Sequence, residues 1–301
     1  MALNVEMWVR DIVENFFPNN EFIARSVDHS MYVNGRTVHV PNAGLAPEIT
    51  KNSTEVNLTA TKRTDTDLEY SMDVFRSKPV YVQLSEEQEL SYDKRMSVMG
   101  QMKAEIQRVA AESILASWVP ASGVIVKTSG ATVAAHIPSA TGNRNAMSVA
   151  DVMAVKKEMD KADIPSEGRC MMLDADMYNQ LLESMTNAQV ANFLAGADVA
   201  TGVIGKFMGF DFYMRSKVLK ATSTGAKKEW SASAAATDVA AGLAWHPSCV
   251  SRALGQVTVF ADEKSPAYYG DVMDCEVRAG GCSMRSDKKG VVLIYQGTAT
   301  A

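Results

Sequence analysis

One long amphipathic segment, between Ser85 and Pro120, constrains the fold of this chain more than any other stretch. Ser85 and Gln88 have the spacing of a capping box, and acidic residues follow in the first turn. Proline cannot continue a helix, so Pro120 ends the pattern. Apolar residues recur every three to five positions between these ends, at Tyr92, Met96, Met99, Met102, Ile106, Val109 or Ala110, Ile114 and Trp118. We predict one helix about 50 Å long, with its methionines serving as core packing rather than as cofactor ligands.

The sequence before this helix predicts a long β-hairpin with a charged tip. Asn34-Gly35 is typical of a tight turn, and residues 37–40 follow it as a strand. Between Val56 and Val74, apolar and polar residues alternate on both sides of a charged tip that contains Lys62, Arg63, Asp65 and Asp67. One thin apolar face cannot form a core, so we expect residues 55–75 to project and to be ordered by a neighbouring subunit.

The first 30 residues predict a short amphipathic helix and then an extended arm, because apolar anchors precede the break at Pro18-Asn-Asn20. Trp8, Phe16 and Phe17 are large anchors that need a surface to pack on. These three residues and the four charged residues of the hairpin tip are our candidates for inter-subunit contacts.

Residues 146–252 read as an α+β unit. Helices are predicted at 148–164 and after the cap at Asp174, and strands at 170–173, 210–215 and 239–245. A stretch rich in Ser, Thr, Ala and Gly, residues 221–236, predicts a mobile loop. The tail adds strands around Val257, at 272–277 and at 291–295, with turns at Gly280-Gly281 and at 288–290.

Composition excludes several classes of protein. The 301 residues are enough for about two folding units. A formal net charge of −5 argues against tight nucleic-acid binding, which usually depends on a basic surplus. No apolar run is long enough for a membrane span, and the N-terminus lacks the pattern of a signal peptide. The four cysteines form no Cys-x-x-Cys pair, so we expect reduced thiols in a cytosol.

The search for chemistry gives few candidates. Gly202 and Gly205 precede Lys206, but the spacing is too short for a phosphate-binding loop, so we predict a simple turn. His246 and Cys249 lie three apart and could form a thiolate nucleophile, although Pro247 between them favours a packed cap. The other histidines are scattered. We therefore expect no catalytic residue, no metal and no cofactor.

The order of these elements resembles the major capsid protein of tailed bacteriophages, the Hong Kong 97 type of shell subunit. Residues 205–216 are similar to a Gly-x-x-x-Gly-Phe-x-Val-x-x-Ser stretch of such subunits, and residues 241–250 are similar to their strand-to-helix segment. The resemblance implies an α+β fold with these parts: an N-terminal arm at 1–30, an E-loop region at 31–84, a P-domain with a spine helix at 85–145, an A-domain at 146–252, and P-domain return strands at 253–301.

The resemblance also implies a function. We expect a non-enzymatic subunit that forms pentamers and hexamers and closes an icosahedral head around double-stranded DNA, without sequence-specific binding. Separate portal, scaffolding and cement proteins are the expected partners, with the protein in the virion after assembly in the cytoplasm of a bacterial host. Met1 directly precedes the arm, so we expect a separate scaffold or none.

Two alternatives remain open. An encapsulin-like nanocompartment shell would enclose protein cargo, and neighbouring portal and terminase genes would argue against it. A cysteine hydrolase would use Cys249 and His246, and would lose ester turnover in Cys249→Ala.

Covalent bonding between subunits is a further feature of some shells of this type, which join an E-loop Lys to a P-domain Asn. Lys62 could supply the amine. The last Asn of the chain is Asn192, and Asn143 and Asn145 lie only at the domain edge, so we expect no such crosslink.

Overall fold

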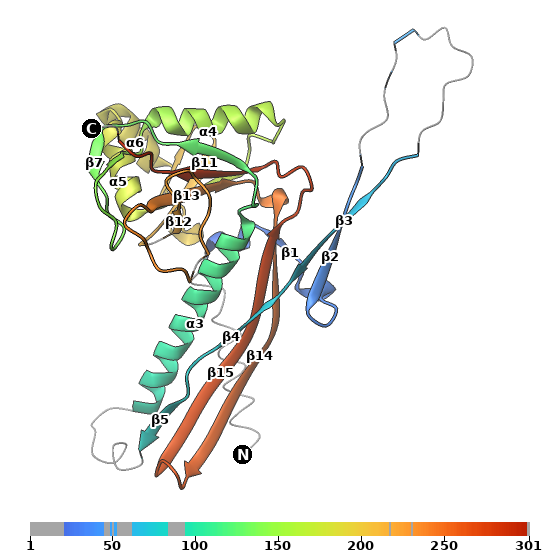
Figure 1. The fold of residues 1–301 in the computed structure, drawn as a ribbon, viewed down its shortest axis with the longest axis vertical. Coiled ribbons are helices and arrows are strands. Elements are labelled where there is room, and N and C mark those ends of the chain that lie inside the picture. The colour runs from blue at the N-terminus through green and yellow to red at the C-terminus, as the bar shows by residue number, and fades with distance from the viewer. Residues whose placement is uncertain are drawn as a thin grey trace.

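The computed structural model describes residues 21–44, 49, 51–52, 62–83, 94–216, 218–229 and 231–299. The chain forms a rounded head, a long arm that leads away from the head, and a two-stranded ribbon that projects past one side of the head (Figure 1). The head comprises residues 119–249 and 284–299, and the arm comprises residues 73–83, 94–118 and 250–283. The ribbon is formed by strands β2 and β3.

The head is built on a seven-stranded mixed sheet with the order β10-β11-β9-β13-β16-β6, in which β12 also pairs with β13. Strands β9 (Arg169–Asp174), β13 (Val239–Trp245) and β16 (Val291–Tyr295) are buried along their whole length, as expected for strands covered on both faces. The strands predicted at these places are confirmed. The outer strands are β6 (Val124–Lys127), β10 (Gly205–Phe207), β11 (Phe210–Arg215) and β12 (Leu219–Ala221).

Three helices pack on this sheet: α4 (Val149–Lys161), α5 (Ala175–Ser184) and α6 (Asn187–Ala195). The predicted starts of α4 and α5 are confirmed. The backbone N–H of Ser148 donates to Asp151 Oδ2 at 2.8 Å, and Asp174 Oδ1 accepts from the N–H of Met177 at 2.7 Å. The remaining short elements of the head are β7 (Thr132–Ala134), β8 (Asn143–Asn145), η3 (Val199–Thr201) and η4 (Pro247–Cys249).

Helix α3 (Lys94–Trp118) forms one side of the arm and spans about 37 Å. Its apolar stripe is buried against β15, with Ile106, Ala110, Ile114 and Trp118 at most 8% exposed. The predicted long helix is therefore confirmed over 94–118. The capping box predicted at Ser85 and Gln88 lies outside the described residues.

The other side of the arm is a five-stranded sheet around the long antiparallel pair β14 (Val250–Ser265) and β15 (Gly270–Ser283). Strands β4 (Asp73–Arg76) and β5 (Val80–Gln83) pair with β15, and β1 (Val27–Asp28) pairs with β14. The strands predicted around Val257 and at 272–277 are confirmed as parts of this longer pair.

The turn predicted at Gly280-Gly281 is wrong, because both residues lie inside β15 opposite Ala253 and Arg252. A Cβ atom at Gly280 would come within 3.1 Å of Met72 Cα, and one at Gly281 within 3.0 Å of Trp118 Nε1. These glycines therefore allow close packing rather than chain reversal. The turn predicted at 288–290 is confirmed. The turn predicted around Gly202 and Gly205 is confirmed only at Gly202, because Gly205 and Lys206 lie in strand β10.

The ribbon pairs β2 (Thr37–Asn42) with β3 (Thr66–Ser71), after a turn in which Gly35 has a φ of +64°. The Asn34-Gly35 turn is confirmed. The described partner of β3 is β2, and the hairpin pairing predicted within 56–74 stays a prediction, because its first strand falls within residues 53–61. Residues 53–61 lie outside the described part of the chain.

The predicted projection of residues 55–75 is wrong for their last part. Val38, Tyr70 and Met72 are buried on the inner face of the ribbon, in a small core with Ala253. Strand β4 then joins the arm sheet. The base of the ribbon is therefore ordered by its own subunit.

The loop predicted at 221–236 begins at the end of β12, and its described residues contact both the head and α3, while its mobility stays a prediction. Lys227 Nζ donates to the carbonyl oxygens of Val119 and Ala116 at 2.8 and 3.2 Å, beside the C-terminus of α3. Lys228 Nζ lies 2.6 Å from Asp238 Oδ2. None of the helices in the described residues is long and apolar enough to cross a membrane.

Candidate assembly surfaces

The charged residues predicted at the hairpin tip lie at the start of β3: Lys62, Arg63 and Asp65 precede the strand, and Asp67 lies within it, paired with Pro41. All four are exposed. Arg63 Nε lies 2.7 Å from Asp65 Oδ1, which also accepts from the N–H of Gly44 at 2.8 Å. Asp67 Oδ2 lies 2.7 Å from His39 Nδ1 on β2. These contacts fasten the outer part of the ribbon to itself, and the role of Lys62, Arg63, Asp65 and Asp67 in inter-subunit contact stays a prediction.

The ion pairs Arg63–Asp65 and His39–Asp67 shift the pKa values of two side chains on the ribbon. The hydrogen bond from Arg63 holds the pKa of Asp65 below its usual value, and the hydrogen bond to Asp67 raises the pKa of His39. Asp65 is therefore charged at neutral pH. The outer ribbon presents charges of both signs to any surface it meets.

Trp8, Phe16 and Phe17, the apolar candidates, lie outside the described residues. The first described segment, residues 21–32, is here called the strap. It contains η1 (Glu21–Ala24), β1 and η2 (Ser30–Tyr32). The strap begins in an aromatic cluster, in which the ring of Phe22 lies edge-on to Trp118 and Trp245 at centroid distances of 6.1 and 6.5 Å. Trp245 Nε1 also donates to the carbonyl of Arg25 at 2.9 Å.

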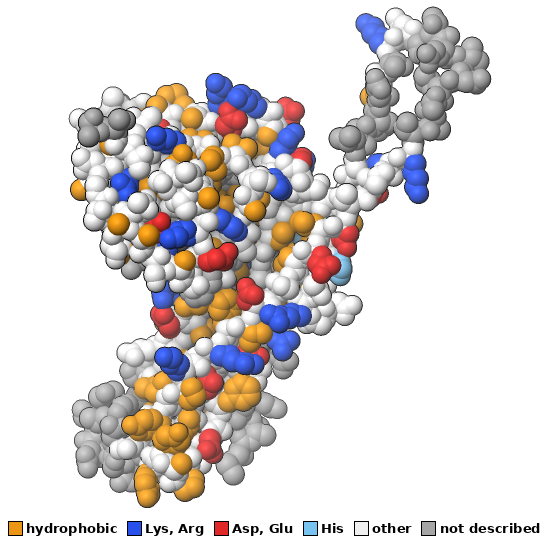
Figure 2. All heavy atoms as spheres, viewed as in Figure 1, with side chains coloured by type: hydrophobic (Ala, Val, Ile, Leu, Met, Phe, Trp, Pro, Cys, Tyr) orange, Lys and Arg blue, Asp and Glu red, His pale blue; other side chains and the backbone are white. Residues whose placement is uncertain are grey.

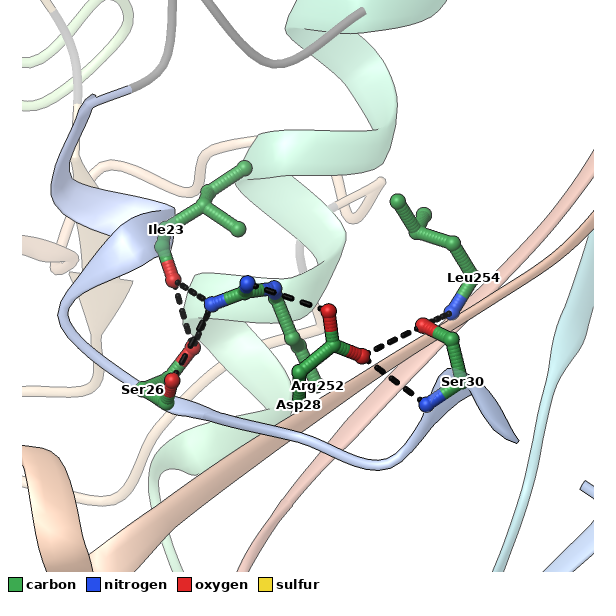
Figure 3. Close-up of polar contacts among 6 residues, drawn as sticks. All are labelled: Ile23, Ser26, Asp28, Ser30, Arg252 and Leu254. Carbon is green, nitrogen blue, oxygen red and sulfur yellow. Dashed lines mark hydrogen bonds and ion pairs between the residues drawn. The ribbon is translucent and has the colours of Figure 1, made fainter. Parts of the chain in front are cut away.

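The middle of the strap is held by Arg252 at the start of β14 (Figure 3). Arg252 Nη1 donates to the carbonyl of Ile23 at 2.6 Å, and to the carbonyl and Oγ of Ser26 at 3.0 and 3.1 Å. Its Nη2 lies 3.2 Å from Asp28 Oδ2. Asp28 Oδ1 accepts from the N–H and Oγ of Ser30, and Ser30 Oγ accepts from the N–H of Leu254.

Sequence reasoning missed this strap network. The partners of Arg252 are more than 220 positions away in the sequence, so no local pattern connects them. Only the apolar pair Phe22-Ile23 signalled that the segment packs against something.

Exposed aromatic side chains gather at the far end of the arm, where Figure 2 shows apolar atoms on the surface. Tyr81 and Tyr268 stack with ring centroids 5.5 Å apart, and each is about half exposed. Phe260 is 53% exposed and Tyr269 82%. Sequence reasoning did not single out these residues, because Tyr81 and Phe260 lie between apolar neighbours and the sequence alone does not show which side chains face outward.

The geometry at His246 and Cys249 gives no support to a cysteine hydrolase. His246 is the cap of η4, and its Nδ1 lies 2.7 Å from Ser248 Oγ. The Cys249 thiol is buried beside Ser248 Oγ at 3.8 Å, and burial raises its pKa. A thiol held neutral in this way is a poor nucleophile, and the packed cap predicted for this segment is confirmed.

Within the described part of the chain, no group of three or more His, Cys, Asp or Glu residues could hold a metal ion. His29, His39 and His136 lie on separate elements. The candidate functional surfaces are therefore surfaces for contact with other protein chains, namely the outer ribbon, the strap and the end of the arm.

Known structures share this architecture. The capsid of the cyanophage P-SCSP1u is similar with a TM-score of 0.62 and 19% identity, over 90% of this chain and 86% of that chain. The capsid of Ralstonia phage GP4 is similar with a TM-score of 0.65 and 13% identity, over 92% and 88%. A virus-like particle from Pyrococcus furiosus is similar with a TM-score of 0.55 and 9% identity, over 96% of each chain. The Hong Kong 97-like fold expected from the order of elements is confirmed.

Sequence comparison adds the family. The chain gives no significant match to curated proteins. A family model described as "Phage capsid protein" matches residues 26–296, a region that contains the strap from Ser26 onward, the ribbon, the arm and nearly the whole head. Because that match spans most of the sequence, the chain belongs to the phage capsid protein family and is a structural major capsid protein.

Proposed function

We propose that this protein is a non-enzymatic shell subunit that self-associates into pentamers and hexamers and closes an icosahedral head around double-stranded DNA. Membership in the phage capsid protein family supports the proposal that the chain is a subunit of a shell. The capsid matches, P-SCSP1u and GP4 among them, support a subunit of this fold in such a shell.

The observation that carries the proposal is the projecting ribbon. Its base is buried on the arm, but its outer part leads away from both the arm and the head (Figure 1). A two-stranded ribbon is marginally stable by itself in water. The outer ribbon gains no core of its own by projecting from the subunit. We therefore propose that it contacts a neighbouring copy of the subunit.

The parts of the subunit are proposed to correspond to those of the family. The N-terminal arm ends in the strap, the E-loop contains the ribbon, the P-domain contains α3 with β14 and β15, and the A-domain is the head. Strands β6 and β16 pair in the head sheet with β13 and its neighbours. We therefore place residues 119–145 and 284–299 with the A-domain, although the sequence places them with the P-domain.

The remaining partners follow from the same proposal. A container confines DNA that another machine packs, so a net charge of −5 is compatible with the role. Separate portal, scaffolding and cement proteins complete the head, which assembles in the cytoplasm of the bacterial host and becomes the capsid of the virion.

A pair of double variants tests whether the ribbon makes inter-subunit contacts. Arg63→Ser with Asp65→Ser removes the ion pair of the outer ribbon without changing net charge. Lys157→Ser with Glu183→Ser is the matched control, because it removes one exposed charge of each sign from α4 and α5 of the head.

We expect both variants to unfold at the temperature of the natural protein. Sedimentation should show slower shell formation only for the ribbon variant. Equal assembly by the two variants would contradict the contact role of the outer ribbon.

A further inference from the structure

The strap connects the aromatic cluster to the ribbon. From Phe22, where it is packed against Trp118 and Trp245, it pairs in parallel with β14 at Val27 and Asp28. After η2 it turns at Gly35 into β2. Whatever fixes the middle of the strap therefore also fixes the point from which β2 starts.

The polar contacts in the middle of the strap form a closed circuit on β14 (Figure 3). The circuit leaves β14 through the side chain of Arg252, passes through the carboxylate of Asp28 to the hydroxyl of Ser30, and returns to β14 at the N–H of Leu254. The Arg252 side chain is 14% exposed and that of Asp28 is 49% exposed, so the charge-assisted bonds to the carbonyls of Ile23 and Ser26 are partly shielded from water, whereas the Asp28 end of the circuit faces solvent. The backbone supports the circuit, because the N–H of His29 donates to the carbonyl of Arg252 at 2.8 Å.

The two strands of the ribbon are attached in different ways. Strand β3 continues through Met72 into β4, which is held by a ladder from Asp73 to Arg76 along β15. Strand β2 lacks a comparable ladder to the arm in the described residues, and it is held by burial of Val38 against Ala253, by the strap circuit and by Arg36. Arg36 Nε donates to the carbonyl of Met72 at 2.8 Å.

We infer that Arg252 is a positioning residue for assembly, which sets the direction in which the ribbon leaves the subunit. It binds three points of the strap at once, at Ile23, Ser26 and Asp28. Because β2 follows the strap after a short turn, the position of the strap at these points determines where β2 begins. The inference rests on the proposed function, because assembly is what the direction of the ribbon serves.

Lysine is the informative replacement for Arg252. An ammonium group keeps the positive charge but is a single point donor, whereas the two Nη atoms of arginine reach the carbonyls and the Asp28 carboxylate together. The aromatic cluster and the arm sheet do not depend on the guanidinium, so Arg252→Lys should fold. Arg278→Lys is the matched control, because Arg278 lies on β15 of the same sheet, is 44% exposed, and approaches Glu276 only at 3.9 Å.

Two measurements on the full chain test the inference. In unassembled subunits, Arg252→Lys should speed amide exchange in β2 about tenfold, while exchange in α3 and β13 stays unchanged. Under assembly conditions followed by light scattering, it should slow particle formation at least about fivefold, because fewer subunits present the ribbon in a competent direction. The control variant should match the natural protein in both measurements.

Each outcome decides the inference. Unchanged exchange in β2 with Arg252→Lys would overturn it, and so would exchange that rises equally in β13, which would mean a general loss of stability. Faster exchange in β2 with normal assembly would overturn the link to assembly. Failure of the natural protein to form particles would count against the proposed function alone, since the exchange measurement does not depend on particles.

Discussion

Ile106 lies in the middle of the α3 stripe and is 8% exposed, packed in the core that joins the arm to the head. Ile106→Asp would place a carboxylate among apolar side chains, at a cost on the order of 4 kcal/mol in the free energy of unfolding. Urea unfolding should show this loss. Met153→Asp on α4 is the control, because Met153 is 49% exposed and its replacement should change stability little. Soluble, assembly-competent Ile106→Asp protein of normal stability would show that the apolar stripe of α3 does not stabilise the arm.

His136 makes one contribution to stability depend on pH. Its Nε2 lies 2.8 Å from Asp174 Oδ2 and 4.0 Å from Asp176 Oδ2. Burial lowers the pKa of His136, but the hydrogen bond and the charges of the two carboxylates outweigh burial, so that the pKa is raised above 6.5.

A raised folded-state pKa stabilises the protein fully below the unfolded value and loses that effect as pH rises through the folded value. His136→Asn should therefore destabilise the protein more at pH 5.5 than at pH 8.5, a comparison that thermal unfolding of both proteins at the two pH values makes directly. A difference that is constant with pH would contradict the charge pairing.

At the scale of elements, local sequence signals predicted what depends on neighbours in the chain. Asp174 caps α5 with its own carboxylate, and at the start of α4 the Asp151 carboxylate accepts from the N–H of Ser148, so both caps depend on residues within three positions. The buried strand at 170–173 was predictable because central strands are apolar on both faces.

Contacts between residues far apart in the sequence could not be predicted. Alternation at 66–71 predicts a strand but cannot show that residues 37–42 are its partner. The sequence predicts a turn at Gly280-Gly281, because no neighbouring residue shows the approach of Met72 and Trp118 that requires glycine there. The role of Arg252 was missed for the same reason, because its partners in the strap are more than 220 positions away in the sequence.

The ribbon should show two levels of protection from hydrogen exchange. Thr66–Ser71 should exchange slowly even in the isolated subunit, because Tyr70 is buried on the ribbon's inner face and the strand is paired with β2. Residues 62–65 are exposed and should exchange fast in the subunit and slowly in assembled particles. Equal exchange of 62–65 in both states would contradict an inter-subunit role for the outer ribbon.

At the scale of the whole molecule, the shape leaves contact surfaces at three extremities, namely the head, the end of the arm and the outer ribbon (Figure 1). The far end of the arm carries the exposed Tyr81 and Tyr268 pair. Such a molecule buries little of these surfaces alone, so its stability in the particle is shared with its neighbours.

The particle should be held by these non-covalent contacts. Asn143 and Asn145 are the asparagines at the edge of the predicted P-domain, where a crosslink to Lys62 would need an amide. The Nδ2 of Asn145 already donates to the carbonyl of Thr128 in its own subunit at 3.3 Å. We expect no bond from Lys62 to an asparagine. Boiling mature particles in SDS with reductant should release one band near 32.6 kDa. A ladder of covalent pentamers and hexamers would contradict this expectation.

The central claim is that this chain builds a closed shell, and electron microscopy of the purified full-length protein tests it most directly. The protein should be imaged alone and again after assembly with the other head proteins of its phage. The account predicts closed particles of uniform size, with clusters of five and six subunits on the surface. Monomers or open, irregular sheets under both conditions would contradict it.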